Sequence, residues 1–530
     1  MTSNFSFAEN EAFDSLLVDE RIYRNLNVSK SKIFSQVKIR KKTVIMMEKV
    51  VSKRLVASSP KEATELYSIN IFLGLFENPL LRSFIRFLYN HHFNNVKSYL
   101  EAALEDIAGV GEKRFSPIRL IFSGIIKAAV HLGCIGLDID EEYIRETLKL
   151  SYFRSGIVNV LSGVGIYGVT KPYRVPAPFL VVWNYTNACN LRCKHCYQRA
   201  DKPTLDELTL EEKLAVIDQL VENNVSIVAF SGGEPLLCED FFKVAKYAYE
   251  RGLYVSVATN GTLLTKENVA RLKATGVAYV EISLDGATAE IHDSFRGVSG
   301  CFEKTRMGIA NSVEAGMFTC IATTTTKHNL NEIPKIISLA KEIGVRRVII
   351  FNFIPTGRGE EIAHLDLTPA ERESLLKYLY RELASGKVEV LSTAPQFSRV
   401  CLQQSLIEGT DILSPTHFVA LNLHGKAKRL TDFLGGCGAG RLYCAIQPNG
   451  LVTPCVFMPI VVGDLRRQSL KDIWLNSQVM NDLRDRSRLK GRCGYCEYKY
   501  VCGGCRARAY AYYKDYLASD PGCIYNISPI

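Results

Sequence analysis

The chain of 530 residues has no long apolar run and no biased composition, and each absence excludes a class of protein. No uncharged apolar run reaches the roughly 18 residues of a membrane-spanning helix. The first 20 residues lack the basic-then-apolar layout of a secretory signal peptide. With 47% hydrophobic and 23% charged residues, the composition excludes a disordered or collagen-like chain. We therefore expect a cytoplasmic globular protein of about three or four domains.

The sequence has 16 cysteines, and their distribution is uneven. Eleven of them fall into one early and one late group, whereas the other five stand alone. In a reducing compartment, thiols at short spacings are typical of metal sites rather than disulfides. The isolated cysteines are Cys134, Cys238, Cys301, Cys320 and Cys401.

Composition changes along the chain predict four regions. Three prolines within residues 171–178 interrupt any helix and mark the first boundary. The predicted regions are a helical N-terminal region (1–175), an α/β barrel (176–366), a connecting region (367–430) and a cysteine-rich C-terminal region (431–530).

The second region alternates short β-rich runs with amphipathic helical stretches. Its strands are nearly continuously apolar, which is typical of a parallel sheet buried on both faces. This pattern predicts a whole or partial α/β barrel, whose chemistry belongs on the loops after the strands. The six predicted strands are 179–185, 226–232, 253–260, 278–286, 318–326 and 346–353.

The early cysteine group directly follows the first predicted strand. Cys189, Cys193 and Cys196 have three and then two residues between them, so all three thiols can face one metal centre. Thiolates select zinc or iron–sulfur clusters. Structural zinc usually takes four ligands, whereas a 4Fe-4S cluster with three protein thiolates keeps one iron open for a substrate or cofactor. The spacing favours the cluster and leaves zinc as the alternative.

This spacing resembles the CxxxCxxC signature of the radical S-adenosylmethionine (SAM) enzymes, which carry it after the first strand of a partial (β/α)6 barrel of the TIM type. The resemblance covers residues 179 to 360 and includes a GGEP segment after the second strand. It implies that the cysteine trio holds a SAM-binding 4Fe-4S cluster. Arg296 matches the carboxylate-binding arginine of the family, and His195 stands where an aromatic residue is usual. The implied SAM contacts are Tyr197, Gly232, Gly233, Glu234, Pro235, Thr259, Asn260, Ser283, Asp285, Arg296 and Ile354.

The resemblance also implies a reaction. The reduced cluster passes one electron into bound SAM, and the resulting 5′-deoxyadenosyl radical abstracts hydrogen from an unactivated carbon. The protein contributes orientation and exclusion of water. A small ferredoxin or flavodoxin is the expected electron donor. An electron carrier without catalysis is the alternative that the SAM motifs argue against.

The late cysteine group resembles the SPASM extension of radical SAM enzymes, which holds two auxiliary 4Fe-4S clusters. A pair of structural zinc ribbons is the alternative reading of the same spacings. By resemblance, the inner cluster has the ligands Cys437, Cys444, Cys455 and Cys505, and the outer cluster has Cys493, Cys496, Cys502 and Cys523. Only Gly503 and Gly504 precede Cys505, where the family commonly has three residues.

Auxiliary clusters of this kind relay electrons, because four protein ligands leave no open iron. In the sulfatase-maturing relatives an acidic residue follows the cysteine that matches Cys455, but here Val456 takes that position. This difference argues against oxidation of a serine or cysteine side chain.

The N-terminal region and the substrate stay open at this point. Residues 21–54 hold eleven Lys and Arg and one acidic residue. The excess of ten positive charges in this segment equals the net charge of the whole chain, +10. A basic segment beside amphipathic helices is typical of a protein at an anionic membrane surface, here the inner membrane face. A helical domain packed on the barrel is the competing interpretation, and no nucleic-acid motif accompanies the charge. The N-terminal region favours a lipid or hydrocarbon substrate, with a ribosomally made peptide and a tetrapyrrole as alternatives.

Overall fold

The computed structural model describes most of the chain after residue 73. The described residues are 74, 76–93, 97–111, 117–137, 140–410, 412–416, 419–422, 433 and 435–526. The basic segment of residues 21–54 lies outside them, so its predicted membrane role is not addressed by the structure. Within the described part, no helix combines the length and the apolarity needed to cross a bilayer.

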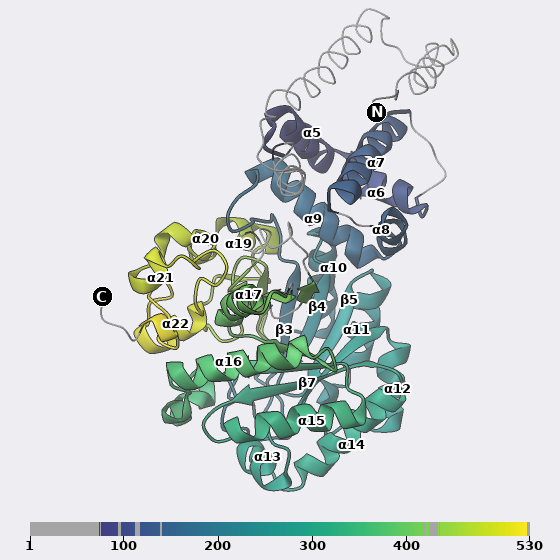
Figure 1. Ribbon diagram of the computed structural model, residues 1–530. Helices are drawn as coiled ribbons and strands as arrows, with labels where there is room; N and C mark the ends of the chain where they lie inside the picture. Colours follow the sequence, from purple (N-terminus) through teal and green to yellow (C-terminus); the bar gives the residue numbers. More distant parts are fainter. Residues whose placement is uncertain are drawn as a thin grey trace, which may run out of the picture. The chain divides into compact units, whose positions relative to one another are not determined.

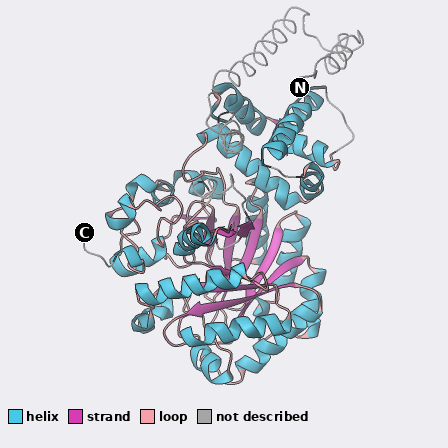
Figure 2. Cartoon of the chain, in the orientation of Figure 1, coloured by secondary structure: helices cyan, strands magenta, loops and turns pink. Residues whose placement is uncertain are grey.

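A ten-stranded sheet organises the described chain (Figure 2). Strands β3 to β9 follow one another in parallel pairs, which confirms the α/β fold class. Their bounds are β3 (Leu180–Thr186), β4 (Ile227–Gly232), β5 (Tyr254–Thr259), β6 (Val277–Ser283), β7 (Phe318–Thr325), β8 (Arg347–Asn352) and β9 (Glu389–Ser392).

The six predicted strands are β3 to β8, and β9 is an additional strand that the sequence did not reveal. It contains only four residues, Glu389–Ser392, and pairs in parallel with β8. Its sequence EVLS is too short to show a periodic pattern.

Helices connect successive parallel strands and pack outside them (Figure 1). Two of them begin with a capping box, in which Thr209 and Glu212, or Thr368 and Glu371, satisfy each other's backbone N–H groups. The connecting helices are α10 (Leu210–Glu222), α11 (Phe241–Glu250), α12 (Lys266–Ala274), α13 (Ala289–Arg296), α14 (Cys301–Glu314), α15 (Ile333–Ile343) and α16 (Pro369–Ala384).

The cysteine-rich C-terminal region extends the same sheet on the other side of β3. Strand β12 (Tyr443–Ile446) pairs in parallel with β3, and β13 (Leu451–Thr453) and β14 (Gly463–Asp464) continue the sheet as antiparallel strands. The cysteine-rich C-terminal region therefore lies directly beside β3, the first strand of the parallel series. The helices that follow strand β9 are α17 (Gln396–Glu408), α19 (Leu470–Asn476), α20 (Gln478–Arg484), α21 (Gly491–Tyr495) and α22 (Arg506–Tyr513).

The described N-terminal residues are helical, as the sequence predicts. Gly165 lets two of these helices approach closely, because a Cβ there would lie 2.9 Å from the backbone nitrogen of Arg86. Ile85 and Leu88 are buried, but Leu80 is 66% exposed. The N-terminal helices are α5 (Pro79–Asn90), α6 (Tyr99–Ala108), α7 (Pro117–Leu137), α8 (Glu141–Leu148) and α9 (Ser151–Tyr167).

Two short hairpins, β1–β2 (His92–Phe93, Lys97–Ser98) and β10–β11 (Ile412–Thr416, Val419–Asn422), complete the described strands.

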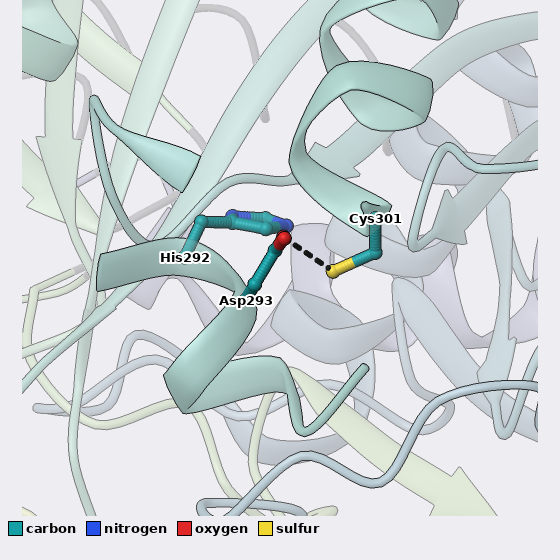
Figure 3. A group of neighbouring side chains, drawn as sticks. All are labelled: His292, Asp293 and Cys301. Atoms are coloured by element: carbon teal, nitrogen blue, oxygen red, sulfur yellow. Dashed lines mark hydrogen bonds between the residues drawn. The ribbon is translucent and has the colours of Figure 1, made fainter. Parts of the chain in front are cut away.

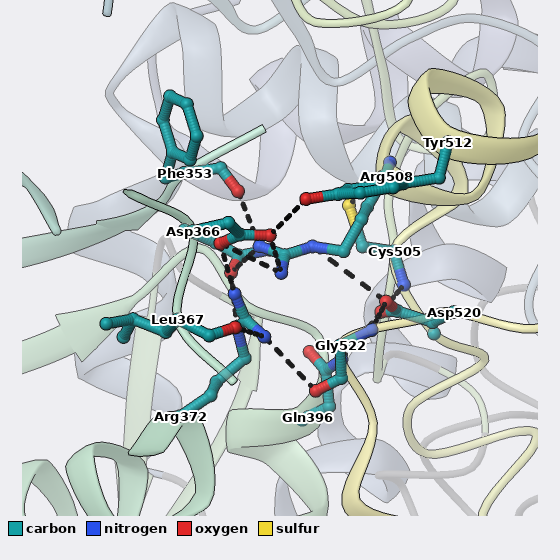
Figure 4. Close-up of polar contacts among 12 residues, drawn as sticks. Phe353, Asp366, Leu367, Arg372, Gln396, Cys505, Arg508, Tyr512, Asp520 and Gly522 are labelled. Carbon is teal, nitrogen blue, oxygen red and sulfur yellow. Dashed lines mark hydrogen bonds and ion pairs between the residues drawn. The ribbon is translucent and has the colours of Figure 1, made fainter. Parts of the chain in front are cut away.

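A buried polar network joins the C-terminal region to the end of strand β8 (Figure 4). The Arg508 guanidinium donates to the carbonyl oxygen of Phe353 at 2.5 Å and pairs with Asp366 at 3.1 Å. Arg372 also pairs with Asp366, at 2.7 Å. Since Arg508 is completely buried, these bonds fix the C-terminal region against the barrel.

Candidate active site

The early cysteine trio lies on the loop after β3 and lines a cavity of about 380 Å³. Cys189, Cys193 and Cys196 belong to one apolar cluster. Burial raises the pKa of the Cys189 thiol to about 11. A bound metal centre would stabilise the thiolate that this environment disfavours.

Arg358, just after β8, holds the trio's loop. Its guanidinium donates to the carbonyl oxygens of Cys193 at 2.9 Å and Ala200 at 3.0 Å. Its backbone N–H donates to the carbonyl oxygen of Cys196 at 2.8 Å. The sequence predicts Ile354 of this segment as a SAM contact but does not reveal the role of Arg358. A basic residue near a loop gives no sign of which carbonyl groups it will reach.

A further cysteine packs against the trio but is engaged elsewhere (Figure 3). The Cys301 thiol donates to the Asp293 carboxylate at 3.1 Å. The same carboxylate accepts the backbone N–H groups of Gly300 at 2.6 Å and Phe302 at 2.8 Å. Although His292, Asp293 and Cys301 have ligand-type atoms within 4.8 Å of one another, the carboxylate serves to cap helix α14. The trio thus presents three thiols to the cavity.

The GGEP segment forms a tight glycine cradle at the end of β4. Gly232 has a φ of +111°, and both Gly232 and Gly233 line the cavity. A Cβ on Gly233 would lie 2.0 Å from the carbonyl oxygen of Ala188. The backbone can approach a ligand here because side chains are absent.

Glu234 and Pro235 do not line this cavity, and Glu234 instead organises the wall beside it. Its carboxylate accepts the Thr259 hydroxyl at 2.8 Å and the backbone N–H of Asn260 at 2.8 Å. Burial raises the Glu234 pKa to about 7. Pro235 opens a short 3-10 helix. Of the predicted SAM contacts in these two segments, Gly232, Gly233, Thr259 and Asn260 line the cavity, whereas Glu234 and Pro235 do not.

Asp285 and Arg296 form a buried ion pair beside the cysteine trio. The Arg296 Nε atom lies 2.6 Å from an Asp285 oxygen, and its Nη1 lies 3.6 Å from the Cys193 sulfur. Arg296 and Ser283 line the cavity, whereas Asp285 lies behind them. His195 stacks on Phe295 at 4.3 Å, and burial lowers its pKa to about 4. The histidine is therefore neutral near pH 7.

Tyr197 and Ile354 also line the cavity. The Tyr197 hydroxyl donates to Asn184 at 2.9 Å, and its ring lies edge-on to Phe457. Phe457 belongs to the C-terminal region, which therefore closes this wall.

The structure brings together the four cysteines predicted for the outer cluster. Gly503 and Gly504 both have positive φ, and a Cβ on Gly504 would lie 3.0 Å from the Cys493 sulfur. Two consecutive left-handed glycines therefore let the chain turn beside this pocket. The cysteines that line it are Cys493, Cys496, Cys502 and Cys523.

Only three of the four cysteines predicted for the inner cluster come together. Cys437, Cys455 and Cys505 line the same large cavity as the early trio. Cys444 is completely buried in the main apolar core on the other face of the sheet. In its place the Tyr443 hydroxyl donates to the Cys455 sulfur at 2.8 Å. The sequence displays the cysteine but not the face of the strand on which it lies.

Comparisons with known proteins agree with this geometry. The radical SAM superfamily model matches residues 183–340, and that of the SPASM iron-sulfur cluster-binding domain matches residues 437–505. The AdoMet-dependent heme synthase of Methanosarcina barkeri is 42% identical over 351 residues, which are 66% of this chain and 97% of that relative. The chain belongs to the radical SAM superfamily.

Other radical SAM proteins resemble it less closely. The mycofactocin maturase MftC of Mycobacterium tuberculosis is 31% identical over 66% of this chain and 83% of its own. The crystal structure of Streptococcus suis SuiB bound to S-adenosylmethionine has a TM-score of 0.57 and 17% identity, with coverage of 81% of this chain and 93% of that one. The SuiB likeness shows the fold alone.

The cofactors of this radical SAM enzyme are SAM, a SAM-binding 4Fe-4S cluster and auxiliary iron–sulfur clusters. The described residues fit them, because three cavity-facing thiols lie beside a glycine cradle and an arginine. The individual ligand and SAM-contact assignments stay predictions.

Proposed function

We propose that this radical SAM enzyme acts on a tetrapyrrole, in place of the lipid chain that the N-terminal sequence favoured. The observation that carries the proposal is the 42% identity to a heme synthase over nearly its whole length. The pre-heme d1 synthase of Dinoroseobacter shibae, 31% identical, has a name of the same kind. The names of both relatives thus refer to the synthesis of a tetrapyrrole.

The cavity offers largely apolar walls to a substrate. Side chains on the inner faces of β3, β4 and β8 line it, including Leu180, Ile227 and Phe351. Apolar walls with a few polar groups are typical of small-molecule and cofactor sites. Arg347 also lines the cavity and pairs with Glu389 at 2.7 Å, so it offers a cation near one wall.

When bound, SAM and the reduced cluster supply a carbon radical that abstracts hydrogen from an unactivated substrate carbon. The chain's own residues hold the reactants at the ends of the parallel strands and exclude water. Arg296 and the glycine cradle orient SAM, while Tyr197 and Phe457 close the side that faces the C-terminal region. Since Cys455 and Cys505 line the same cavity, an auxiliary cluster there is placed to accept an electron from the substrate. A small ferredoxin or flavodoxin is the proposed external donor.

The test is anaerobic reconstitution of the full chain with iron and sulfide, followed by dithionite, SAM and a candidate substrate. Iron coproporphyrin should increase 5′-deoxyadenosine formation and be converted to a product of different mass. A Leu180→Trp variant should lose this conversion but keep slow SAM cleavage without substrate, because the added ring fills the apolar cavity. Peptide-dependent turnover, with no response to any tetrapyrrole, would replace this proposal by peptide maturation.

A further inference from the structure

The register of strand β12 separates two neighbouring side chains. Tyr443 pairs with Leu180, and Cys444 pairs with Val181. Tyr443 and Leu180 line the large cavity, whereas Cys444 and Val181 belong to the apolar core on the opposite face. Because successive side chains of a strand point to opposite faces, only one of the two residues can reach the inner cluster.

Tyr443 is the residue on the cavity face, beside the three predicted ligands. Its hydroxyl lies 2.8 Å from the Cys455 sulfur. Tyr443, Cys455 and Cys505 also share one apolar cluster, in which Cys437 is partly buried. The charged neighbour of Cys444 is instead Arg484, on the side away from the cavity.

The turn before β12 holds this register. The carbonyl oxygen of Gly438 accepts the backbone N–H groups of Leu442 at 2.8 Å and Tyr443 at 3.2 Å, and Gly440 donates back to Tyr443 at 3.0 Å. A slip of one residue would move every side chain of the strand to the other face. Turning Cys444 toward the cavity would therefore break this turn and the pairing with β3.

We infer that the phenolate oxygen of Tyr443 is the fourth protein donor of the inner auxiliary cluster, beside Cys437, Cys455 and Cys505. Cys444 is a core residue and not a ligand. Iron accepts phenolate, as in the tyrosine-ligated haem of catalase. One iron of the inner cluster would then carry a hard oxygen donor and face the substrate cavity. This inference rests on the auxiliary cluster and not on the tetrapyrrole substrate, so the two can fail separately.

Resonance Raman spectroscopy of the reconstituted full chain tests the inference directly. Excitation in the visible region should show tyrosinate ring modes, and ring-deuterated tyrosine should shift them. The modes should persist in Cys444→Ala and disappear in Tyr443→Phe and Tyr443→Cys. Because the first measurement uses the wild-type chain, it does not depend on whether a variant folds.

Iron analysis gives an independent measure. Three cubane clusters predict about 12 iron atoms per chain. Cys444→Ala and Tyr443→Cys should keep this content, whereas Cys455→Ala should lose up to about 4 of them. The inference is overturned if wild-type protein shows no tyrosinate modes, or if Cys444→Ala loses as much iron as Cys455→Ala.

Discussion

The glycine cradle allows a prediction whose size follows from one contact. In Gly233→Ala, the new Cβ would lie 2.0 Å from the carbonyl oxygen of Ala188. An ordinary contact needs more than about 3 Å, so the two strand ends must separate by about 1 Å. The obstacle is backbone, and it carries the 2.7 Å hydrogen bond from the Glu234 N–H to that same oxygen. The change cannot be absorbed by a side-chain rotation.

The displacement reaches the cluster because Ala188 directly precedes Cys189. We expect a loss of stability of about 1–3 kcal/mol from overpacking. A misplacement of about 1 Å in a reacting assembly can cost about 100-fold in rate. SAM cleavage, measured as 5′-deoxyadenosine formed with dithionite, should therefore fall by about two orders of magnitude.

Gly124→Ala is the matched control, since a Cβ there meets nothing within 4 Å. It should keep wild-type cleavage and a melting temperature at least as high as that of the wild type, because alanine favours the helix α7 in which it lies. Gly233→Ala with normal cleavage would show that the cradle does not position SAM.

Four further changes probe other parts of the enzyme. Cys193→Ala should abolish SAM cleavage and leave about 8 of about 12 iron atoms; normal cleavage would remove the trio from the mechanism. Cys496→Ala should spare cleavage without substrate but impair substrate turnover, and equal loss of both would contradict the division of roles. Arg508→Met should cost about 3–5 kcal/mol by leaving buried Asp366 short of a partner, and an unchanged melting temperature would refute this. Burial raises the Glu281 pKa to about 7, so the folded chain holds a proton that the unfolded chain releases above its pKa of about 4.3. The free energy of unfolding should therefore fall as pH rises from about 4.3 to about 7, and Glu281→Gln should reduce that slope; an unaltered slope would contradict the assignment.

Much of the barrel could be predicted because its signal is local. Strands β3 to β8 are apolar runs that alternate with amphipathic helices, and the early cysteine trio follows β3 in the sequence itself. Strand β9 has only four residues, too few to display an apolar run, and only its pairing with β8 shows that it is a strand. Such pairings depend on tertiary contacts that no short window displays.

The site residues also divide into those with a local sequence signal and those whose position depends on tertiary contacts. Thr259 and Asn260 were found with their segment, but the turning of Glu234 away from the cavity depends on three-dimensional packing. Tyr443 and Cys444 differ by one position, and residue type favoured the cysteine. Only the register of β12 against β3 shows which of them faces the cavity.

The position of β12 has a consequence for the order of synthesis. The ribosome synthesises β3 more than 250 residues before β12 (Tyr443–Ile446). During that time β3 is an edge strand of the nascent sheet, because its partner β12 does not yet exist. An exposed edge strand can pair with strands of other chains, which leads to aggregation. A gene shortened before residue 443 should therefore yield inclusion bodies, and assembly of the inner auxiliary cluster must wait until residues 437–505 have been synthesised.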